Sequence, residues 1–256
     1  IALLKGLGFN RISLGIQDFE PDVQQAINRL QSTAEVERLV ETIRANRFDS
    51  INFDLIYGLP RQTLASFERT MNDVVRLRPE RIAVYNYAHM PQLFRNQRAI
   101  KTEELPSPEN KLAILQYIGE RLLDAGYRYI GMDHFVLPED SLAKAADDGS
   151  LQRNFQGYST CKASDLVAVG PSAISQFKGS LFQNAKTLHS WAGSLAQNQL
   201  PIVKGLSMSA EDKLRQHVIM TIACRLRLDY DDVEAAFVIN FCEHFANSLA
   251  RLKPLE

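Results

Sequence analysis

The chain has 256 residues, of which 45% are apolar and 23% are charged, as expected for a globular protein with a sizeable core. Its formal net charge is -1, and acidic and basic residues are mixed along it, so it lacks the basic surface by which proteins bind nucleic acid. No apolar run approaches the ~20 residues that a membrane-spanning helix requires. We therefore expect neither a nucleic-acid partner nor a membrane span.

The first residues, Ile1–Lys5, have the composition of the last turns of a helix, which Gly6 or Gly8 would end. A helix of about five residues does not form alone, because the entropy lost in the first turn exceeds the gain from its hydrogen bond. We therefore expect the upstream part of this helix to lie outside the chain, which is then a piece of a longer protein.

A repeating pattern of strands and helices follows. Alternating apolar and polar residues predict three strands, Phe9–Gln17, Ser50–Tyr57 and Arg81–Tyr87. Apolar faces with helical spacing predict a helix that begins near Pro21 and two more, Ala34–Asn46 and Leu64–Leu77. Strands and helices that alternate with short connections form parallel βα units. The fold class is therefore α/β, with part of a parallel barrel.

The pattern changes after the third strand. A long helix is predicted over Pro106–Ala125, followed by a short strand at Tyr127–Gly131 and by a strand and turn within Asp165–Phe177. From Leu181 onward the chain is predicted to be largely helical. We divide it into a barrel region (1–100), a region that completes the barrel and covers the substrate (101–180), and an incomplete helical C-terminal domain (181–256).

Polar side chains alternate with the apolar ones on the first two strands. If the apolar residues face the outer helices, Ser13 and Gln17 line the barrel on one strand, and Asn52 and Asp54 line it on the next. Gln17 and Asp54 lie toward the carboxyl ends, where barrel enzymes bind ligands. The alternative is a buried polar pair bonded to neighbouring backbone. We favour the binding role, because an unpaired buried polar group costs about 1–3 kcal/mol and two strands repeat the pattern.

Other candidate residues are ambiguous from the sequence alone. Arg29 reads as a solvated helix arginine. His134 follows an acidic residue in a loop setting, which leaves a structural and a substrate-binding role equally open. The five histidines have no metal-ligand spacing, and the three cysteines, Cys161, Cys224 and Cys242, are far apart. The cysteines are typical of the reduced thiols of a cytoplasmic protein, and neither residue type predicts a metal site within the chain.

A collinear set of short motifs narrows the interpretation. The chain resembles the oxygen-independent coproporphyrinogen III oxidases of the radical S-adenosylmethionine superfamily. The likeness covers nearly the whole chain, weakens over the last helices, and rests on the segments Gly8–Phe19, Asn28–Gln31, Asp54–Pro60, Tyr85–Pro91, Tyr129–Phe135, Arg153–Tyr158 and Gly170–Ser175. Each motif is weak alone, but their order along the chain is specific.

The resemblance implies a partial, six-unit (β/α) barrel with a helical C-terminal domain, of which this chain holds the later part. In that family a [4Fe-4S] cluster cleaves S-adenosylmethionine to a 5′-deoxyadenosyl radical. The radical removes hydrogen from a propionate of coproporphyrinogen III, and loss of carbon dioxide leaves a vinyl group. Two propionates are converted, which gives protoporphyrinogen IX. The reaction also requires an electron donor, which the sequence does not identify.

The resemblance also implies cofactor contacts. Two S-adenosylmethionine molecules lie side by side in family members, and the first would contact Gln17, Arg29 and Asp54. Ala88 and Ile174 match positions that line the second. The resemblance therefore changes the expected role of Arg29 from a solvated residue to a ligand contact, since a fixed guanidinium suits a carboxylate.

The departure from the family pattern is as informative as the match. The C-x-x-x-C-x-x-C motif that holds the cluster in the family is absent from the sequence. We expect it upstream of the chain, and we expect the chain by itself to bind no cluster and to be inactive.

Two other functions compete with this interpretation. A heme chaperone of the same superfamily would share the Gly-Leu-Pro segment, but such chaperones usually read Gln-Ser-Phe where this chain has Gln17-Asp18-Phe19. An aldolase-type barrel enzyme would need a Schiff-base lysine at a strand end, and the three predicted strands contain none. The oxidase is favoured over both.

Overall fold

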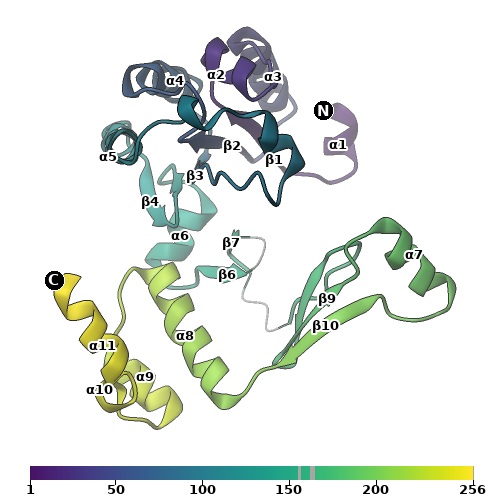
Figure 1. Cartoon of the computed structure of the whole chain (residues 1–256), viewed down its shortest axis with the longest axis vertical. Coiled ribbons are helices and arrows are strands. Elements are labelled where there is room, and N and C mark those ends of the chain that lie inside the picture. Colours follow the sequence, from purple (N-terminus) through teal and green to yellow (C-terminus); the bar gives the residue numbers. More distant parts are fainter. Residues whose placement is uncertain (155–156, 162–164, 256) are drawn as a thin grey trace. The chain divides into compact units, whose positions relative to one another are not determined.

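The computed structural model describes residues 1–154, 157–161 and 165–255. By its internal contacts the chain divides into two compact units, Ile1–Lys144 and Ala145–Glu256 (Figure 1). Every helix in the described residues is too short or too polar to cross a bilayer. The unit boundary differs from the three regions expected from the sequence, which remain a prediction.

Unit 1 is a five-stranded sheet of order β1-β2-β3-β5-β4 with helices packed against it. Its strands are β1 (Arg11–Gln17), β2 (Ser50–Tyr57), β3 (Arg81–Asn86), β4 (Arg128–Gly131) and β5 (His134–Val136). Its helices are α1 (Ala2–Gly6), α2 (Pro21–Ala26), α3 (Thr33–Ala45), α4 (Leu64–Leu77) and α5 (Pro108–Asp124), with short 3-10 turns η1 (Arg95–Ala99) and η2 (Thr102–Glu104). Helix α6 (Ser141–Asp147) runs across the unit boundary.

The first three strands are parallel, as the alternation of strands and helices predicted. Phe53 of β2 lies opposite Leu14 of β1 and Ile82 of β3, so one row of apolar side chains crosses all three strands. Beyond β3 the direction reverses, because β5 pairs antiparallel with β3 and with β4. The predicted short strand is therefore one arm of a hairpin that extends the sheet.

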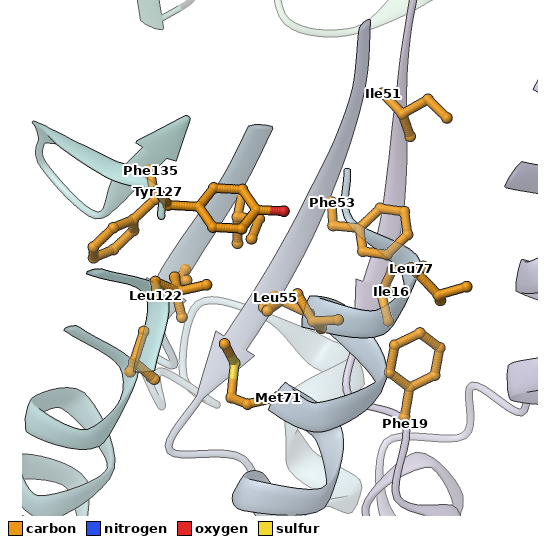
Figure 2. Packing of buried hydrophobic residues seen from close by; sticks show 14 of the residues in the cluster. Ile16, Phe19, Ile51, Phe53, Leu55, Met71, Leu77, Leu122, Tyr127 and Phe135 are labelled. Carbon is orange, nitrogen blue, oxygen red and sulfur yellow. The ribbon is translucent and has the colours of Figure 1, made fainter. Parts of the chain in front are cut away.

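The apolar face of this sheet packs against the helices. Helix α3 is capped by Ser32 and Glu35, and α4 by Thr63 and Ser66, in reciprocal capping boxes that satisfy the first free N–H groups of each helix. The apolar faces of both helices join the apolar face of the sheet in one core. Figure 2 shows this layer, and its fully buried members include Phe53, Leu55, Phe67, Met71, Ile82, Ile114, Ile118 and Leu122.

Unit 2 combines a small antiparallel sheet with a group of helices. Its strands are the hairpin β6 (Gln152–Asn154) and β7 (Gly157–Ser159), and the sheet β8 (Ile174–Phe177), β9 (Ser180–Asn184) and β10 (Ile202–Ser207) in the order β10-β9-β8. Its helices are α7 (Leu188–Ala196), α8 (Ala210–Arg225), α9 (Tyr230–Phe237), α10 (Phe241–His244) and α11 (Ala246–Leu252), followed by η3 (Lys253–Leu255). Leu214, Val233, Phe241 and Phe245 form the core of the helical part.

The chain from Leu181 onward is largely helical, as predicted, but the prediction missed two strands within this region. Residues Ser180–Asn184 and Ile202–Ser207 are paired strands on either side of α7, and the chain is mainly helical from Ala210. Helix α7 lies between the two strands in the sequence. Each strand therefore pairs with residues that are too far away in the sequence for a local periodicity pattern to reveal. Tertiary pairing decided this segment.

Candidate functional site

Polar side chains line the face of β1 and β2 that is opposite the core, as the alternation predicted. Asn52 Nδ2 donates to Ser13 Oγ and to Asp54 Oδ1, at 2.9 Å each. The Ser13 hydroxyl donates to Asp54 Oδ2 at 2.6 Å. The two bonds of Ser13 cross between β1 and β2, the third runs along β2, and together they fix both oxygens of the Asp54 carboxylate.

Gln17 ends β1 in an irregular turn. The register with β2 shifts between Gly15, which lies opposite Asp54, and Gln17, which lies opposite Leu55. This β-bulge leaves Ile16 as the extra residue, buried in the core, and Gln17 takes the left-handed backbone region with φ 60. Its side-chain oxygen Oε1 is buried and has no hydrogen-bond partner among the described residues. A buried acceptor without a partner is uncommon in a folded protein, which makes Gln17 a candidate for a hydrogen bond with a ligand.

Gly15 provides the space in which two other side chains meet. The Arg29 guanidinium donates through Nη2 to the Gly15 carbonyl at 2.8 Å. A Cβ atom at position 15 would lie 3.0 Å from that Nη2 and 3.1 Å from Gln17 Nε2. Any other residue at position 15 would have to push these two side-chain ends aside by a few tenths of an ångström. The structure brings Gln17 and Arg29 together at Gly15, and the strand register places Asp54, a third predicted site residue, opposite Gly15.

The chemistry of this group suits a polar ligand with both donors and acceptors. Arg29 has five N–H groups, of which one is used on Gly15, and no carboxylate among the described residues pairs with it. Asp54 offers acceptor oxygens to hydroxyl or ammonium groups, and the Gln17 amide offers a donor and an unpaired acceptor. The site lies at the carboxyl ends of parallel strands, where α/β barrels bind ligands.

Ala88 and Ile174 lie in different units. Ala88 is exposed in the segment after β3, and its carbonyl accepts a hydrogen bond from Gln97 Nε2 at 3.0 Å. Ile174 begins β8 in unit 2, where it pairs with Gln183. Their role stays a prediction. The Phe155 and Gln156 positions of the Arg153–Tyr158 motif lie outside the described residues.

The histidine that the sequence left open lies in a tight hairpin between β4 and β5. His134 Nδ1 lies 2.7 Å from the carbonyl of Met132, and its ring meets the ring edge of Tyr85. Burial raises the pKa of the neighbouring Asp133 carboxyl. Burial and the charge of Asp133 also raise the pKa of Tyr57, so these groups share one partly desolvated environment at the end of β2.

The sequence analysis missed the buried polar network that begins one residue after Gln17. Asp18 has no exposed surface, and Gln62 and Gln24 are nearly as buried. The available signal was a charged residue between apolar Ile16 and Phe19 at a predicted strand end. Its partners lie 44 and 52 positions away, and no local pattern identifies them.

The described residues offer no place for a metal ion or cluster. They contain no group of three or more His, Cys, Asp or Glu side chains arranged to hold a metal. The three cysteines are free, with Cys224 buried and Cys161 and Cys242 exposed.

Comparison with known proteins gives two results at the family level. Residues 1–74 match the Radical SAM superfamily. The oxygen-independent coproporphyrinogen III oxidase of Thermostichus vulcanus is 46% identical over 250 residues, which cover 97% of this chain and 77% of that protein.

Longer relatives and a solved structure agree. The enzymes of the same name from Pseudomonas aeruginosa and Escherichia coli are 50% and 43% identical over 96% and 98% of this chain. The chain spans about half of each, 54% and 55% of their lengths. The structure titled "Coproporphyrinogen III oxidase (HemN) from Escherichia coli is a Radical SAM enzyme" matches with a TM-score of 0.94 at 43% identity, over 98% of this chain and 58% of that one.

Proposed function

The chain belongs to the family of oxygen-independent coproporphyrinogen III oxidases, and we propose that the protein catalyses the reaction that gives this family its name. In this reaction two propionate side chains of coproporphyrinogen III lose carbon dioxide and hydrogen and become vinyl groups, which yields protoporphyrinogen IX, a step of heme biosynthesis. The observation that carries the proposal is the group around Gly15, where Gln17 and Arg29 converge beside Asp54.

The residues of this group fit S-adenosylmethionine. The cofactor carries a carboxylate, an ammonium group and ribose hydroxyls, which match in turn a guanidinium, a carboxylate and an amide. Arg29 would hold the carboxylate with N–H groups that Gly15 does not use. Asp54 would accept from a hydroxyl or ammonium group, and Gln17 would present its unpaired Oε1 to a donor. When bound, S-adenosylmethionine supplies the radical that removes hydrogen from the substrate.

The residues of this chain do not fit a [4Fe-4S] cluster. Such a cluster requires several cysteine thiolates that converge on one site. Cys161, Cys224 and Cys242 are free thiols at very different degrees of burial, and the described residues hold no metal-binding group. We assign no step to a cluster through residues of this chain.

The work of the chain's own residues in this proposal is binding and orientation. Ser13 and Asn52 hold both oxygens of Asp54, so the carboxylate does not need to be ordered when the ligand arrives. The Gly15 carbonyl fixes one arm of the Arg29 guanidinium in the same way. Groups that are ordered before binding lose less side-chain entropy on binding, which increases the affinity.

Further parts of the proposal rest on the family likeness. A second S-adenosylmethionine would contact Ala88 and Ile174, and an unidentified electron donor would reduce the enzyme. The cytoplasm is the proposed compartment, since free thiols such as Cys161 are typical of reducing surroundings.

The test uses protein from the complete gene, purified and reconstituted without oxygen. We expect conversion of coproporphyrinogen III to protoporphyrinogen IX that depends on S-adenosylmethionine. Asp54→Ala removes an acceptor from a charged or polar ligand group, about 1–3 kcal/mol, which corresponds to roughly ten- to hundredfold weaker cofactor binding by equilibrium dialysis. Asp49→Ala, an exposed aspartate just before the same strand, is the matched control and should bind normally.

Two outcomes would contradict the proposal. Protein that retains heme but converts no coproporphyrinogen would identify the heme chaperone instead. Unchanged affinity of Asp54→Ala at full iron content would make Asp54 a structural residue. Iron content is measured in parallel, so that loss of the cluster is not mistaken for loss of the cofactor site.

A further inference from the structure

The conformation of Gln17 needs support from its surroundings. Its φ of 60 lies in the left-handed region, and the Asp18 N–H donates to the Ile16 carbonyl at 2.8 Å across it. A hydrogen bond between residues two apart around such a residue forms a γ-turn, which is rare and strained. A residue other than glycine in this region costs on the order of 1–3 kcal/mol and persists only where neighbouring groups fix it.

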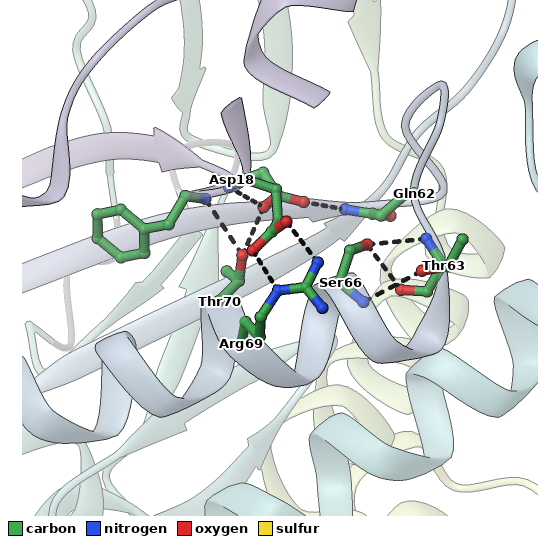
Figure 3. Close-up of polar contacts among 8 residues, drawn as sticks. Asp18, Gln62, Thr63, Ser66, Arg69 and Thr70 are labelled. Atoms are coloured by element: carbon green, nitrogen blue, oxygen red, sulfur yellow. Dashed lines mark hydrogen bonds and ion pairs between the residues drawn. The ribbon is translucent and has the colours of Figure 1, made fainter. Parts of the chain in front are cut away.

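The carboxylate of Asp18 is the group that fixes the chain directly after this turn (Figure 3). One of its oxygens accepts from the backbone N–H of Glu20 at 2.9 Å and from the hydroxyl of Thr70 on α4. The other accepts from Gln62 Nε2 at 2.6 Å. The Thr70 oxygen accepts in turn from the N–H of Phe19 at 3.2 Å, so the residues that follow Gln17 are held against α4.

Gln62 extends the network to the loop after β2. Its Oε1 accepts from the N–H groups of Gly58 and Leu59, at 2.6 and 3.2 Å. Since a backbone N–H only donates, Oε1 must face the loop and Nε2 must face Asp18. Nε2 also donates to the carbonyl of Ile56 at 3.0 Å, two residues after Asp54. The orientation of the amide is therefore fixed from both sides.

Gln24 extends the network to the loop that carries Arg29. Its Nε2 donates to the Asp18 carbonyl at 2.8 Å and to the Gln31 carbonyl at 2.9 Å, and its Oε1 accepts from the Gln31 N–H at 3.0 Å. The N–H of Arg29 donates to the Gln24 carbonyl at 2.9 Å. Asp18 is thus the residue shared by the three segments that carry Gln17, Arg29 and Asp54.

We propose that Asp18 is a positioning residue for S-adenosylmethionine binding, which holds the Gln17 turn, the Arg29 loop and the end of β2 in one arrangement. This inference rests on the proposed function. A purely structural role does not require a charge here, because well-packed apolar residues stabilise a core at least as well as buried ionised groups do. Burial does raise the pKa of this carboxyl, so the charge carries a cost at this position.

The experiment exchanges the hydrogen-bonding roles of Asp18 and Gln62 in protein from the complete gene. Asp18→Asn keeps the shape of the side chain. The NH2 group of the asparagine then faces the NH2 group of Gln62, unless one of the two amides turns around and loses its hydrogen bond with a backbone N–H group. The double variant Asp18→Asn/Gln62→Glu restores one donor and one acceptor across the pair, while the Ile56 carbonyl loses its donor from residue 62. The matched control is Asp140→Asn, a buried aspartate at the opposite end of the sheet, bonded to Arg81.

Three measurements are compared: S-adenosylmethionine affinity with iron content, the midpoint of urea unfolding, and amide hydrogen exchange in protein without cofactor. We expect about tenfold weaker cofactor binding for Asp18→Asn at full iron content, and partial recovery of the affinity in the double variant. The amides of Asp18 and Gly58 should exchange faster in the single variant only. Asp140→Asn should lower the unfolding midpoint and leave the affinity unchanged.

Each other outcome counts against the inference in a defined way. If Asp18→Asn binds the cofactor as wild type does, Asp18 is a core residue and the proposed function stands. Loss of affinity in Asp140→Asn equal to that in Asp18→Asn would trace the effect to stability, which also overturns the inference. If wild type binds no S-adenosylmethionine, the proposed function fails and the inference fails with it. Should Asp18→Asn not fold, Thr70→Val removes one donor from Asp18 and is judged by the same measurements.

Discussion

Two buried aspartates lie at opposite ends of the same parallel strands and are stabilised in different ways. Asp140, at the amino ends, accepts two hydrogen bonds from the Arg81 guanidinium, at 2.8 and 2.9 Å. Asp18, at the carboxyl ends, forms no ion pair among the described residues and is held by uncharged donors around a strained turn. The amino end therefore has an ion pair typical of a stabilising contact, and the carboxyl end has a strained turn held by uncharged donors, which the proposed cofactor site would explain.

The largest expected effect concerns the amino end. Asp140→Ala leaves the Arg81 guanidinium partly buried without its carboxylate, which typically lowers the free energy of unfolding by about 3–5 kcal/mol. Urea unfolding measures this loss, and cofactor affinity below the transition should equal that of wild type. A drop in affinity as large as that of Asp54→Ala would show that the two ends of the sheet are not independent.

A smaller effect is expected at the carboxyl end, where a substitution should lower cofactor affinity without lowering stability. In Gln17→Gly the left-handed φ is no longer strained, which stabilises the folded state. Glycine also makes the unfolded chain more flexible, which offsets part of this gain, so the free energy of unfolding should rise by about 1 kcal/mol or less. Cofactor affinity should fall about tenfold, because the buried Oε1 is lost. Gln17→Asn keeps an amide and serves as the comparison. A destabilised glycine variant would mean that the side chain, and not the turn, supports the fold.

The smallest effect is a difference in pH dependence between the two aspartates. Burial raises the pKa of Asp18 above its ordinary value of 3.8, so the folded state binds its proton more readily than the unfolded state does. Its contribution to stability is then fully present below about pH 4 and is lost as the pH rises through the raised pKa. The charge of nearby Glu20 adds to the rise in the pKa of Asp18, and Arg69, which is paired with Glu20, also interacts electrostatically with Asp18.

The measurement compares urea unfolding of wild type and Asp18→Asn between about pH 7 and pH 4. Because the asparagine does not titrate, wild type should gain stability relative to the variant as the pH is lowered. If the variant instead gains stability relative to wild type as the pH is lowered, the hydrogen-bond donors lower the pKa of Asp18 and burial does not raise it.

Much of unit 1 could be predicted from the sequence, because its signals are local. The period-2 alternation predicted β2 (Ser50–Tyr57) with the correct face for Asp54, and the helical period predicted α4 (Leu64–Leu77). In unit 2 the same approach missed β9 and β10, whose pairing partners lie across α7.

The sequence by itself determined which face of the first two barrel strands is polar, and so it placed Gln17 and Asp54 on one side of the sheet. Alternation is a property of neighbouring residues, and burial of apolar side chains enforces it. Only the tertiary structure decided that Arg29 lies over Gly15 and that Asp18 joins three segments of the chain. Those contacts depend on residues brought together by the packing of α2 and α4 against the sheet, and no local pattern encodes such distances.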